Sequence, residues 1–279
     1  MKKLLVSLGV LAGVSLLAGN AEAATKYVEI GHSNHNFVKT QRQLKVNGTA
    51  KKVSYTIPKG TIVEATLDNI PNDKREYVRL DMSRLSYRLR GNQRDYGTKR
   101  ILATTKTFKK VHVPKYVQYY TTQLTYPSHI GRNRVADGNL YAGLKIPDNL
   151  DYTKSNPTQR IYVTADGYLE YYEKAPMLSP TVKQVPTVSA KITQVERKSG
   201  SSLTKLYTKK AVPTAIADRI SKTGSQQYVT IINRRYRVSA TVSYVKQATT
   251  NVGSIDMATQ YQVKKHNFFM ASDVVFPEE

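Results

Sequence analysis

The feature that most limits the fold of this chain is a succession of short alternating segments separated by turn residues. Residues 53–57 read Val-Ser-Tyr-Thr-Ile, and Pro58-Lys59-Gly60 follows before another apolar run at residues 62–67. Apolar residues at a spacing of two predict strands with one buried face, and Pro and Gly predict turns. Twenty tyrosines and frequent Thr and Val also favour strands. We therefore predict a mostly-β chain of two or three small barrel or sandwich modules, with at most one or two short helices.

The first residues have the three zones of a secretory signal peptide. Lys2 and Lys3 precede an apolar run at residues 4–17, and Ala21-Glu22-Ala23 supplies the small-x-small cleavage pattern. The apolar run is shorter than the roughly 20 residues of a spanning helix. We expect cleavage after Ala23, no integral membrane span, and a secreted protein. The absence of cysteine and the excess of lysine favour a bacterial, Gram-positive exporter, and residues 275–279 show no sorting signal.

The rest of the chain divides by changes in composition. We expect an N-terminal module at 24–105, a second β module at 106–174, a Pro-containing linker at 175–190 and a C-terminal α+β module at 191–279. Repeated prolines favour an extended linker, because proline removes ladder donors. Alternating valines leave an edge strand as the other interpretation of residues 175–190.

Local patterns predict several individual elements. Residues 85–87 suggest a short closing strand, and Asp166-Gly167 is a hairpin turn signal. Residues 215–220 form the best helix candidate. Two strand-like runs flank Asn233-Arg234, which we interpret as a second hairpin turn. A weak repeat at residues 76–82, 161–167 and 267–273 combines an aromatic, an apolar residue and an aspartate, and could mark the ends of related modules.

Two of these segments resemble a known family. The run Tyr55-Thr56-Ile57-Pro58-Lys59-Gly60-Thr61-Ile62-Val63, followed by residues 77–80, looks like bacterial SH3-type wall-binding modules, and residues 268–274 resemble their last strand. The export signal, basic charge and absence of cysteine also resemble surface-layer-type (S-layer) and wall-associated proteins of lactic acid bacteria. The resemblance implies SH3-like modules that bind cell-wall polymers without catalysis.

The charge balance points to an anionic partner. The chain carries 43 basic and 20 acidic residues, a formal net charge of +23. Such an excess attracts polyanions over about 8–10 Å at ordinary salt. Outside a Gram-positive cell, the abundant polyanions are teichoic acids, so we expect teichoic acid or another anionic polysaccharide rather than nucleic acid. Self-association remains open.

Arginines and tyrosines supply the candidate binding residues. Arginine makes bidentate contacts to phosphate, and tyrosine can stack on sugar rings or build a buried face. The candidate polymer-binding residues are Arg84, Arg88, Arg90, Arg94, Arg100, Arg234, Arg235 and Arg237. The candidate aromatic platform is Tyr119, Tyr171 and Tyr236, with core packing as the alternative.

Catalytic signatures are scarce. Without cysteine, the chain cannot be a sortase, a cysteine peptidase or a cysteine-dependent transpeptidase. His32 and His35 have a metal-compatible spacing, but their Gly, Ser and Asn neighbours favour a loop. No nucleophile elbow or phosphate loop appears, and the carboxylates are scattered. We expect no enzyme activity, no cofactor and no metal. The leading hypothesis is a secreted wall-bound protein, with a host-matrix or mucin adhesin and a wall hydrolase or accessory subunit as alternatives.

Overall fold

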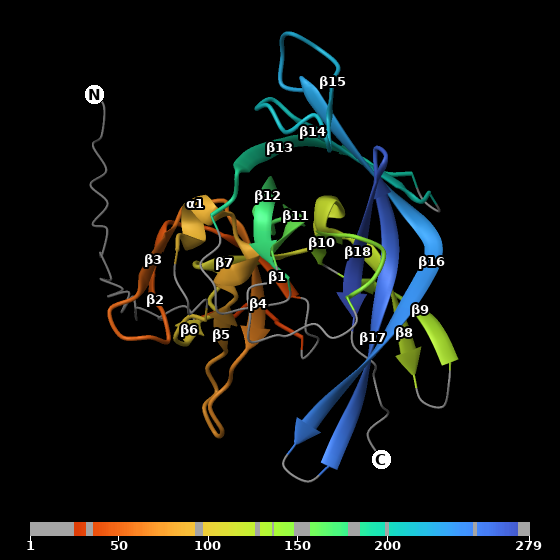
Figure 1. Cartoon of the computed structure of the whole chain (residues 1–279). Coiled ribbons are helices and arrows are strands. Elements are labelled where there is room, and N and C mark those ends of the chain that lie inside the picture. Colours follow the sequence, from red (N-terminus) through yellow and green to blue (C-terminus); the bar gives the residue numbers. More distant parts are fainter. Residues whose placement is uncertain are drawn as a thin grey trace, which may run out of the picture.

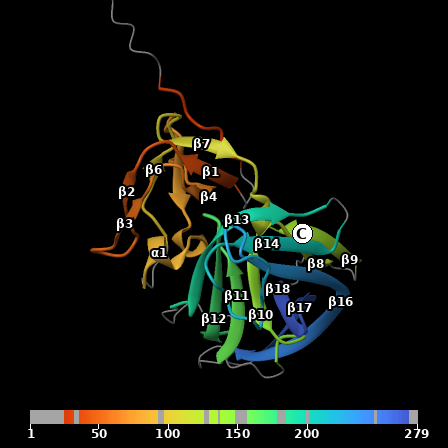
Figure 2. The ribbon, with the colours of Figure 1, turned by 90° about the horizontal axis from the view of Figure 1, so that it is seen from above.

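The computed structural model describes residues 25–31, 36–92, 97–125, 129–135, 137–147, 157–177, 185–198, 201–247 and 250–272. For residues 120–125, 129–135, 236–247, 250–256 and 272 the backbone alone is described. The described chain is mostly β, with one α-helical turn and two 3-10 turns, which confirms the expected fold class. Two β units lie side by side (Figures 1 and 2).

The N-terminal unit is a five-stranded antiparallel sheet with a separate hairpin. Its sheet order is β6-β5-β4-β1-β7, and the hairpin pairs β2 with β3. The strands are β1 (Asn36–Thr40), β2 (Leu44–Asn47), β3 (Ser54–Ile57), β4 (Ile62–Leu67), β5 (Tyr77–Leu80), β6 (Ile101–Leu102) and β7 (Phe108–Val111). The alternation that predicted the strand at residues 53–57 is confirmed, because Tyr55 and Ile57 are buried while Ser54 and Thr56 are exposed.

The C-terminal unit is a closed barrel. Its strands follow the order β14-β13-β12-β11-β10-β18-β17-β16-β15, and β14 also pairs with β16, which closes the sheet on itself. The strands are β10 (Gly138–Ala142), β11 (Pro157–Val163), β12 (Tyr168–Pro176), β13 (Val188–Glu196), β14 (Leu203–Thr208), β15 (Asp218–Arg219), β16 (Tyr228–Gln247), β17 (Thr250–Val263) and β18 (His266–Ser272). A hairpin of β8 (Tyr119–Thr125) and β9 (His129–Val135) contacts the barrel through β17 and β18. Closure removes most of the exposed strand edges that an open sheet would present.

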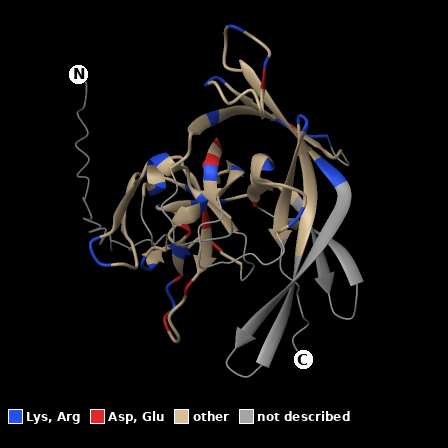
Figure 3. Cartoon of the chain, in the orientation of Figure 1, with Lys and Arg blue, Asp and Glu red and all other residues tan. Residues whose placement is uncertain are grey.

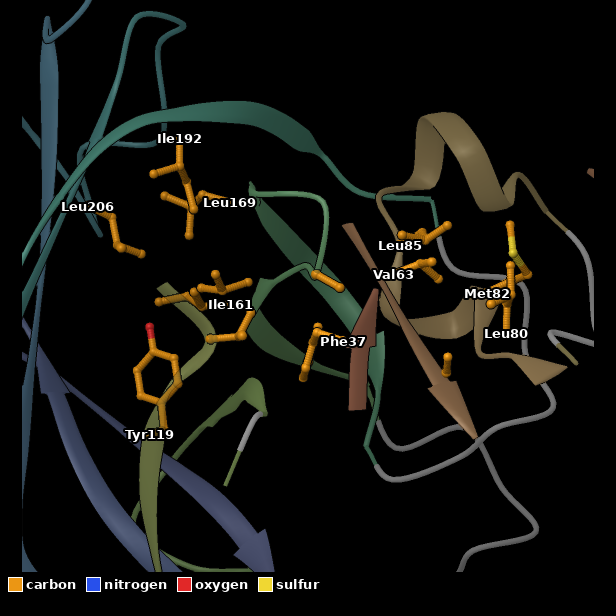
Figure 4. Packing of buried hydrophobic residues seen from close by; sticks show 14 of the residues in the cluster. Phe37, Val63, Leu80, Met82, Leu85, Tyr119, Ile161, Leu169, Ile192 and Leu206 are labelled. Atoms are coloured by element: carbon orange, nitrogen blue, oxygen red, sulfur yellow. The ribbon is translucent and has the colours of Figure 1, made fainter. Parts of the chain in front are cut away.

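One hydrophobic core runs through both units. Phe37 and Val63 belong to the same buried cluster as Ile161, Leu169 and Leu206 of the barrel. Figure 4 shows these side chains in one continuous layer that crosses from the N-terminal sheet into the barrel. The two units therefore pack against each other through apolar contacts as well as polar ones.

A short helical segment of the N-terminal unit lies against the barrel. It consists of the 3-10 turn η1 (Met82–Arg84) and the α-helical turn α1 (Tyr87–Arg90), and a further 3-10 turn, η2 (Lys115–Val117), leads into β8. The prediction of a closing strand at residues 85–87 is thus wrong. Asp81 accepts from the Ser83 amide and starts η1, and Gly91 ends α1 by donating to the Tyr87 carbonyl.

Tertiary pairing overrides two further predictions. The predicted helix at residues 215–220 is instead a turn, in which Ile216 and Ala217 donate to the Pro213 carbonyl, followed by the strand pair Asp218↔Val229. The predicted turn at Asn233-Arg234 lies inside the continuous strand β16. The strand continues there because β14 and β17 pair with it from both sides at Asn233. Its register with β17 shifts between Arg234 and Val238.

The hairpin at Asp166-Gly167 is confirmed. Thr164 to Gly167 connect β11 to β12, and Gly167 has a φ of +79°. The three repeat segments fall on β5, β11 and β18, of which β11 and β18 both pair with β10. Of the predicted linker, residues 178–184 lie outside the described residues, and its ends belong to β12 and β13. The domain boundaries stay predictions.

Candidate anion-binding cleft

A cleft opens between β2 and β6 in the N-terminal unit. Its volume is about 580 Å³. One wall consists of residues 42–47, which include the whole of β2, and the other of residues 99–102 with Thr104 and Thr107. The two walls come from segments more than 50 residues apart in sequence, so the fold alone brings them together.

Backbone bonds fix the distance between the two walls at one end. The Lys99 amide donates to the Asn47 carbonyl at 2.8 Å, and the Thr49 amide donates to the Gly97 carbonyl at 3.0 Å. Further along, the Gln41 amide donates to the Thr107 carbonyl at 2.9 Å. The cleft is therefore framed by main-chain hydrogen bonds, which position its side chains on a fixed backbone.

The alternation of β2 decides which side chains are available in the cleft. Leu44 and Val46 are buried in the core, whereas Lys45 and Asn47 are exposed. Their cross-strand partners on β3 follow the same alternation, with buried Ile57 opposite Leu44. A strand with this pattern presents its polar side chains on one face.

Among the residues that the structure describes, four cations and no carboxylate line the cleft. They are Arg42, Lys45, Lys99 and Arg100, all of them exposed. Within the described part of the chain, Arg42, Lys45 and Lys99 make no ion pair. Figure 3 shows that basic positions outnumber acidic ones around this unit. The cleft thus concentrates positive charge, and three of its four cations have no acidic partner among the described residues.

Arg100 differs from the other three because it has an acidic partner. Its Nε lies 2.8 Å from Asp68 Oδ2, and Arg79 reaches the same oxygen at 2.5 Å. Desolvation opposes ionisation of Asp68, but the hydrogen bonds from Arg100 and Arg79 outweigh it and lower the pKa of the carboxyl group. Asp68 therefore stays ionised at neutral pH and holds Arg100 at the rim of the cleft.

The chemistry of the lining suits a phosphate- or carboxylate-bearing polymer. Guanidinium and ammonium groups bind phosphate oxygens, with arginine adding bidentate geometry. Asn47, Gln43 and the Thr104–Thr107 hydroxyl pair, 2.9 Å apart, add neutral hydrogen-bonding groups. The described chain contains no group of three His, Cys, Asp or Glu side chains placed to hold a metal ion.

Two of the arginines singled out from the sequence have structural partners instead. Arg84 is largely buried and bonds Glu64 at 3.0 Å and Asp137 at 2.9 Å. Arg90 is buried and bonds Glu170 at 3.2 Å. Both belong to the contact between the helical segment and the barrel, so their guanidinium groups are already engaged.

The other predicted arginines are scattered. Arg88 is exposed, with its guanidinium carbon 5.7 Å from the centre of the Tyr168 ring. Arg234 and Arg235 lie on β16, Arg235 being exposed, and only Arg100 lines the cleft. Arg94 lies outside the described residues, as does the side chain of Arg237. The predicted arginines that the structure describes therefore do not lie in one site.

The two members of the predicted aromatic platform whose side chains are described are buried. Tyr119 is 2% and Tyr171 5% exposed, and the Tyr119 ring contacts Tyr261 edge-on with centroids 5.9 Å apart. Both rings pack in the core, which was the alternative interpretation, so neither offers a face for stacking. The side chain of Tyr236 lies outside the described residues.

Sequence reasoning missed Arg42, Lys45 and Lys99. The signal that could have found Lys45 is the alternation of residues 44–47, which places it on the exposed face of a strand. Nothing in the linear sequence brings Lys99 opposite that strand. Arg100 was among the candidate polymer-binding residues predicted from the sequence.

The comparisons with known proteins add no further identification. No protein-family model matches the chain, and neither the curated proteins nor the solved structures give a match. Among the described residues, no helix has the length and apolar character needed to cross a membrane.

Proposed function

We propose that this protein is a secreted, non-catalytic cell-surface protein that binds anionic wall polymers, teichoic acid foremost, through the cleft between β2 and β6. The observation that carries the proposal is a cleft whose described lining holds four cations and no carboxylate. The signal-peptide pattern and the net charge of +23 support the same function.

The arrangement favours an extended polyanion over a small enclosed ligand. Arg42, Lys45 and Lys99 are exposed, and each contributes an attraction that salt screens. Single contacts of this kind are weak, so useful affinity requires several at once. A polymer with a repeated negative charge satisfies that requirement.

The test is cosedimentation of the mature protein with Gram-positive walls, intact or stripped of teichoic acid, over a salt series. We expect binding that needs the polymer and falls steeply with salt. The triple variant Arg42→Gln, Lys45→Gln, Lys99→Gln should raise Kd by about 10- to 100-fold, because three exposed contacts contribute about 0.5–1 kcal/mol each.

A matched variant separates the cleft from net charge. Lys51→Gln, Lys74→Gln, Lys110→Gln removes the same three charges from exposed positions of the same unit outside the cleft. This control should retain most of the affinity. Equal losses in both variants would refute a cleft site. Undiminished binding to stripped walls at high salt would instead point to peptidoglycan or a protein receptor.

A further inference from the structure

Two lysines of the N-terminal unit stand directly opposite each other. Lys39 of β1 and Lys109 of β7 are cross-strand partners, and both are exposed. Opposed residues of an antiparallel pair share one face, with Cβ atoms about 4.5–5.5 Å apart. Like charges in this arrangement repel, so the pair lowers stability unless an anion lies between them.

A third cation lies beside this pair. The turn after β3 is bonded to β1, since the Gly60 amide donates to the Thr40 carbonyl at 2.9 Å. Lys39 extends over this turn, with its Cε 3.8 Å from the position of a Cβ on Gly60. Lys59, also exposed, is the preceding residue of the turn. None of the three lysines makes an ion pair within the described part of the chain.

The lysine group is close to the cleft. Lys39 precedes Arg42 by three residues, and Lys109 follows Thr107 by two, so the backbone separations are at most about 7–11 Å. The Gln41–Thr107 hydrogen bond ties the two connecting segments together. The group and the cleft therefore lie on neighbouring segments of the backbone.

We infer that Lys39, Lys109 and Lys59 extend the cleft into a continuous track for a linear polyanion. The inference rests on the proposed function and extends its site: the polymer is bound along the cleft and the lysine group together, through many regularly spaced negative charges, rather than at the cleft by a single phosphate or a chain end. A long polymer occupies the cleft and the lysine group together, and a short one fills the cleft alone. Its negative groups also relieve the repulsion between Lys39 and Lys109.

The length of the polyanion distinguishes binding along the whole track from binding in the cleft alone. Binding of inorganic tripolyphosphate and of long-chain polyphosphate to the mature protein is measured by calorimetry at low salt. The double variant Lys39→Gln, Lys109→Gln should weaken the long chain about five- to tenfold and leave tripolyphosphate unchanged. The control Lys51→Gln, Lys74→Gln removes two exposed charges elsewhere and should leave the affinity for both probes within about twofold.

The outcomes separate this inference from the proposal beneath it. Equal effects of the double variant and its control on the long chain would overturn the track while leaving the cleft in place. Loss of tripolyphosphate binding in the double variant would show that the short probe binds at the lysine group, which would count against both the track and the cleft. If the wild-type protein binds neither tripolyphosphate nor long-chain polyphosphate, both the cleft and the track are refuted. Thermal unfolding checks folding, since Lys39→Gln, Lys109→Gln should match or slightly exceed wild-type stability.

Discussion

Arg90 and Glu170 form a buried ion pair that joins the two β units, with Arg90 Nη2 3.2 Å from Glu170 Oε2. The two side chains are 5% and 0% exposed. Glu170 also accepts from the Tyr87 amide at 2.6 Å and from the Tyr172 hydroxyl at 2.6 Å. The pair thus sits in a satisfied polar network between α1 and β12, which explains why this arginine is unavailable to a ligand.

Removing one partner of this pair should be costly. Arg90→Met is expected to lower the free energy of unfolding by about 3–5 kcal/mol, because it leaves the Glu170 carboxylate buried without its counter-charge. The double variant Arg90→Met, Glu170→Gln should lose less than the sum of the single changes. Urea unfolding gives these values, with the exposed Arg88→Met as control. Equal effects of Arg90→Met and Arg88→Met would contradict a buried, stabilising role.

A second contact between the units depends on Ser86 and Asp166. The Ser86 amide and hydroxyl donate to the two Asp166 oxygens at 2.8 and 2.7 Å, and both residues are buried. Ser86→Ala should cost about 1.5–3 kcal/mol, since it removes a hydrogen bond to a charged group. Ser54→Ala, on the exposed side of β3, should stay within about 0.5 kcal/mol. A Ser86→Ala protein as stable as this control would show that the contact is dispensable.

The sequence predicted correctly those elements that depend on the local residue type. The Asp166-Gly167 turn was found because Gly167 must adopt a positive φ, which the residue type itself signals. The prediction of a turn at Asn233-Arg234 in β16 was wrong because the structure there depends on distant residues. Its path through Asn233 is fixed by Leu203 of β14 on one side and Gln262 of β17 on the other, and no local pattern contains those partners.

The same distinction applies to the cleft. Charge composition predicted a basic surface, but it could not separate the arginines buried in ion pairs from those that stay exposed. Arg90 and Arg100 look alike in the sequence, yet one is buried against Glu170 and the other lies at the cleft rim. Partner choice depends on residues some 30 to 80 positions away, beyond the range of any sequence window.

Buried tyrosines should make the protein sensitive to alkaline pH. Burial raises the pKa of Tyr119, Tyr162 and Tyr172 above the ordinary value near 10. Their stabilising contribution is therefore intact below about pH 10 and is lost as pH rises towards the folded-state pKa, because the unfolded state ionises first. Above pH 10, each such tyrosine should add up to about 1.4 kcal/mol per pH unit to the loss of stability.

The pH slope can be tested with one variant. Tyr162→Phe removes one ionisable group, so the unfolding free energy should fall less steeply between pH 10 and pH 11, even if its value at pH 8 is lower. Absorbance at 295 nm should show buried tyrosines ionising together with unfolding. An unchanged slope in Tyr162→Phe would show that this ring ionises equally in both states.

Two glycines with nearly the same φ provide a matched test of the packing around the Asp166-Gly167 turn. Gly167 and Gly224 have φ of +79° and +81°. A Cβ at Gly167 would lie 3.3 Å from Lys191 Nζ and 3.3 Å from Tyr116 Cζ, whereas a Cβ at Gly224 would meet nothing within 4 Å.

Gly224→Ala should cost about 1–2 kcal/mol from the left-handed backbone alone. Gly167→Ala should cost at least about 1 kcal/mol more, because Tyr116 is held in place by its hydrogen bond to the Ala165 carbonyl at 2.8 Å. Urea unfolding gives the loss of stability in each variant, and the difference between the two losses is the steric cost at Gly167. A difference of zero would mean that Tyr116 and Lys191 move away from the new Cβ without cost.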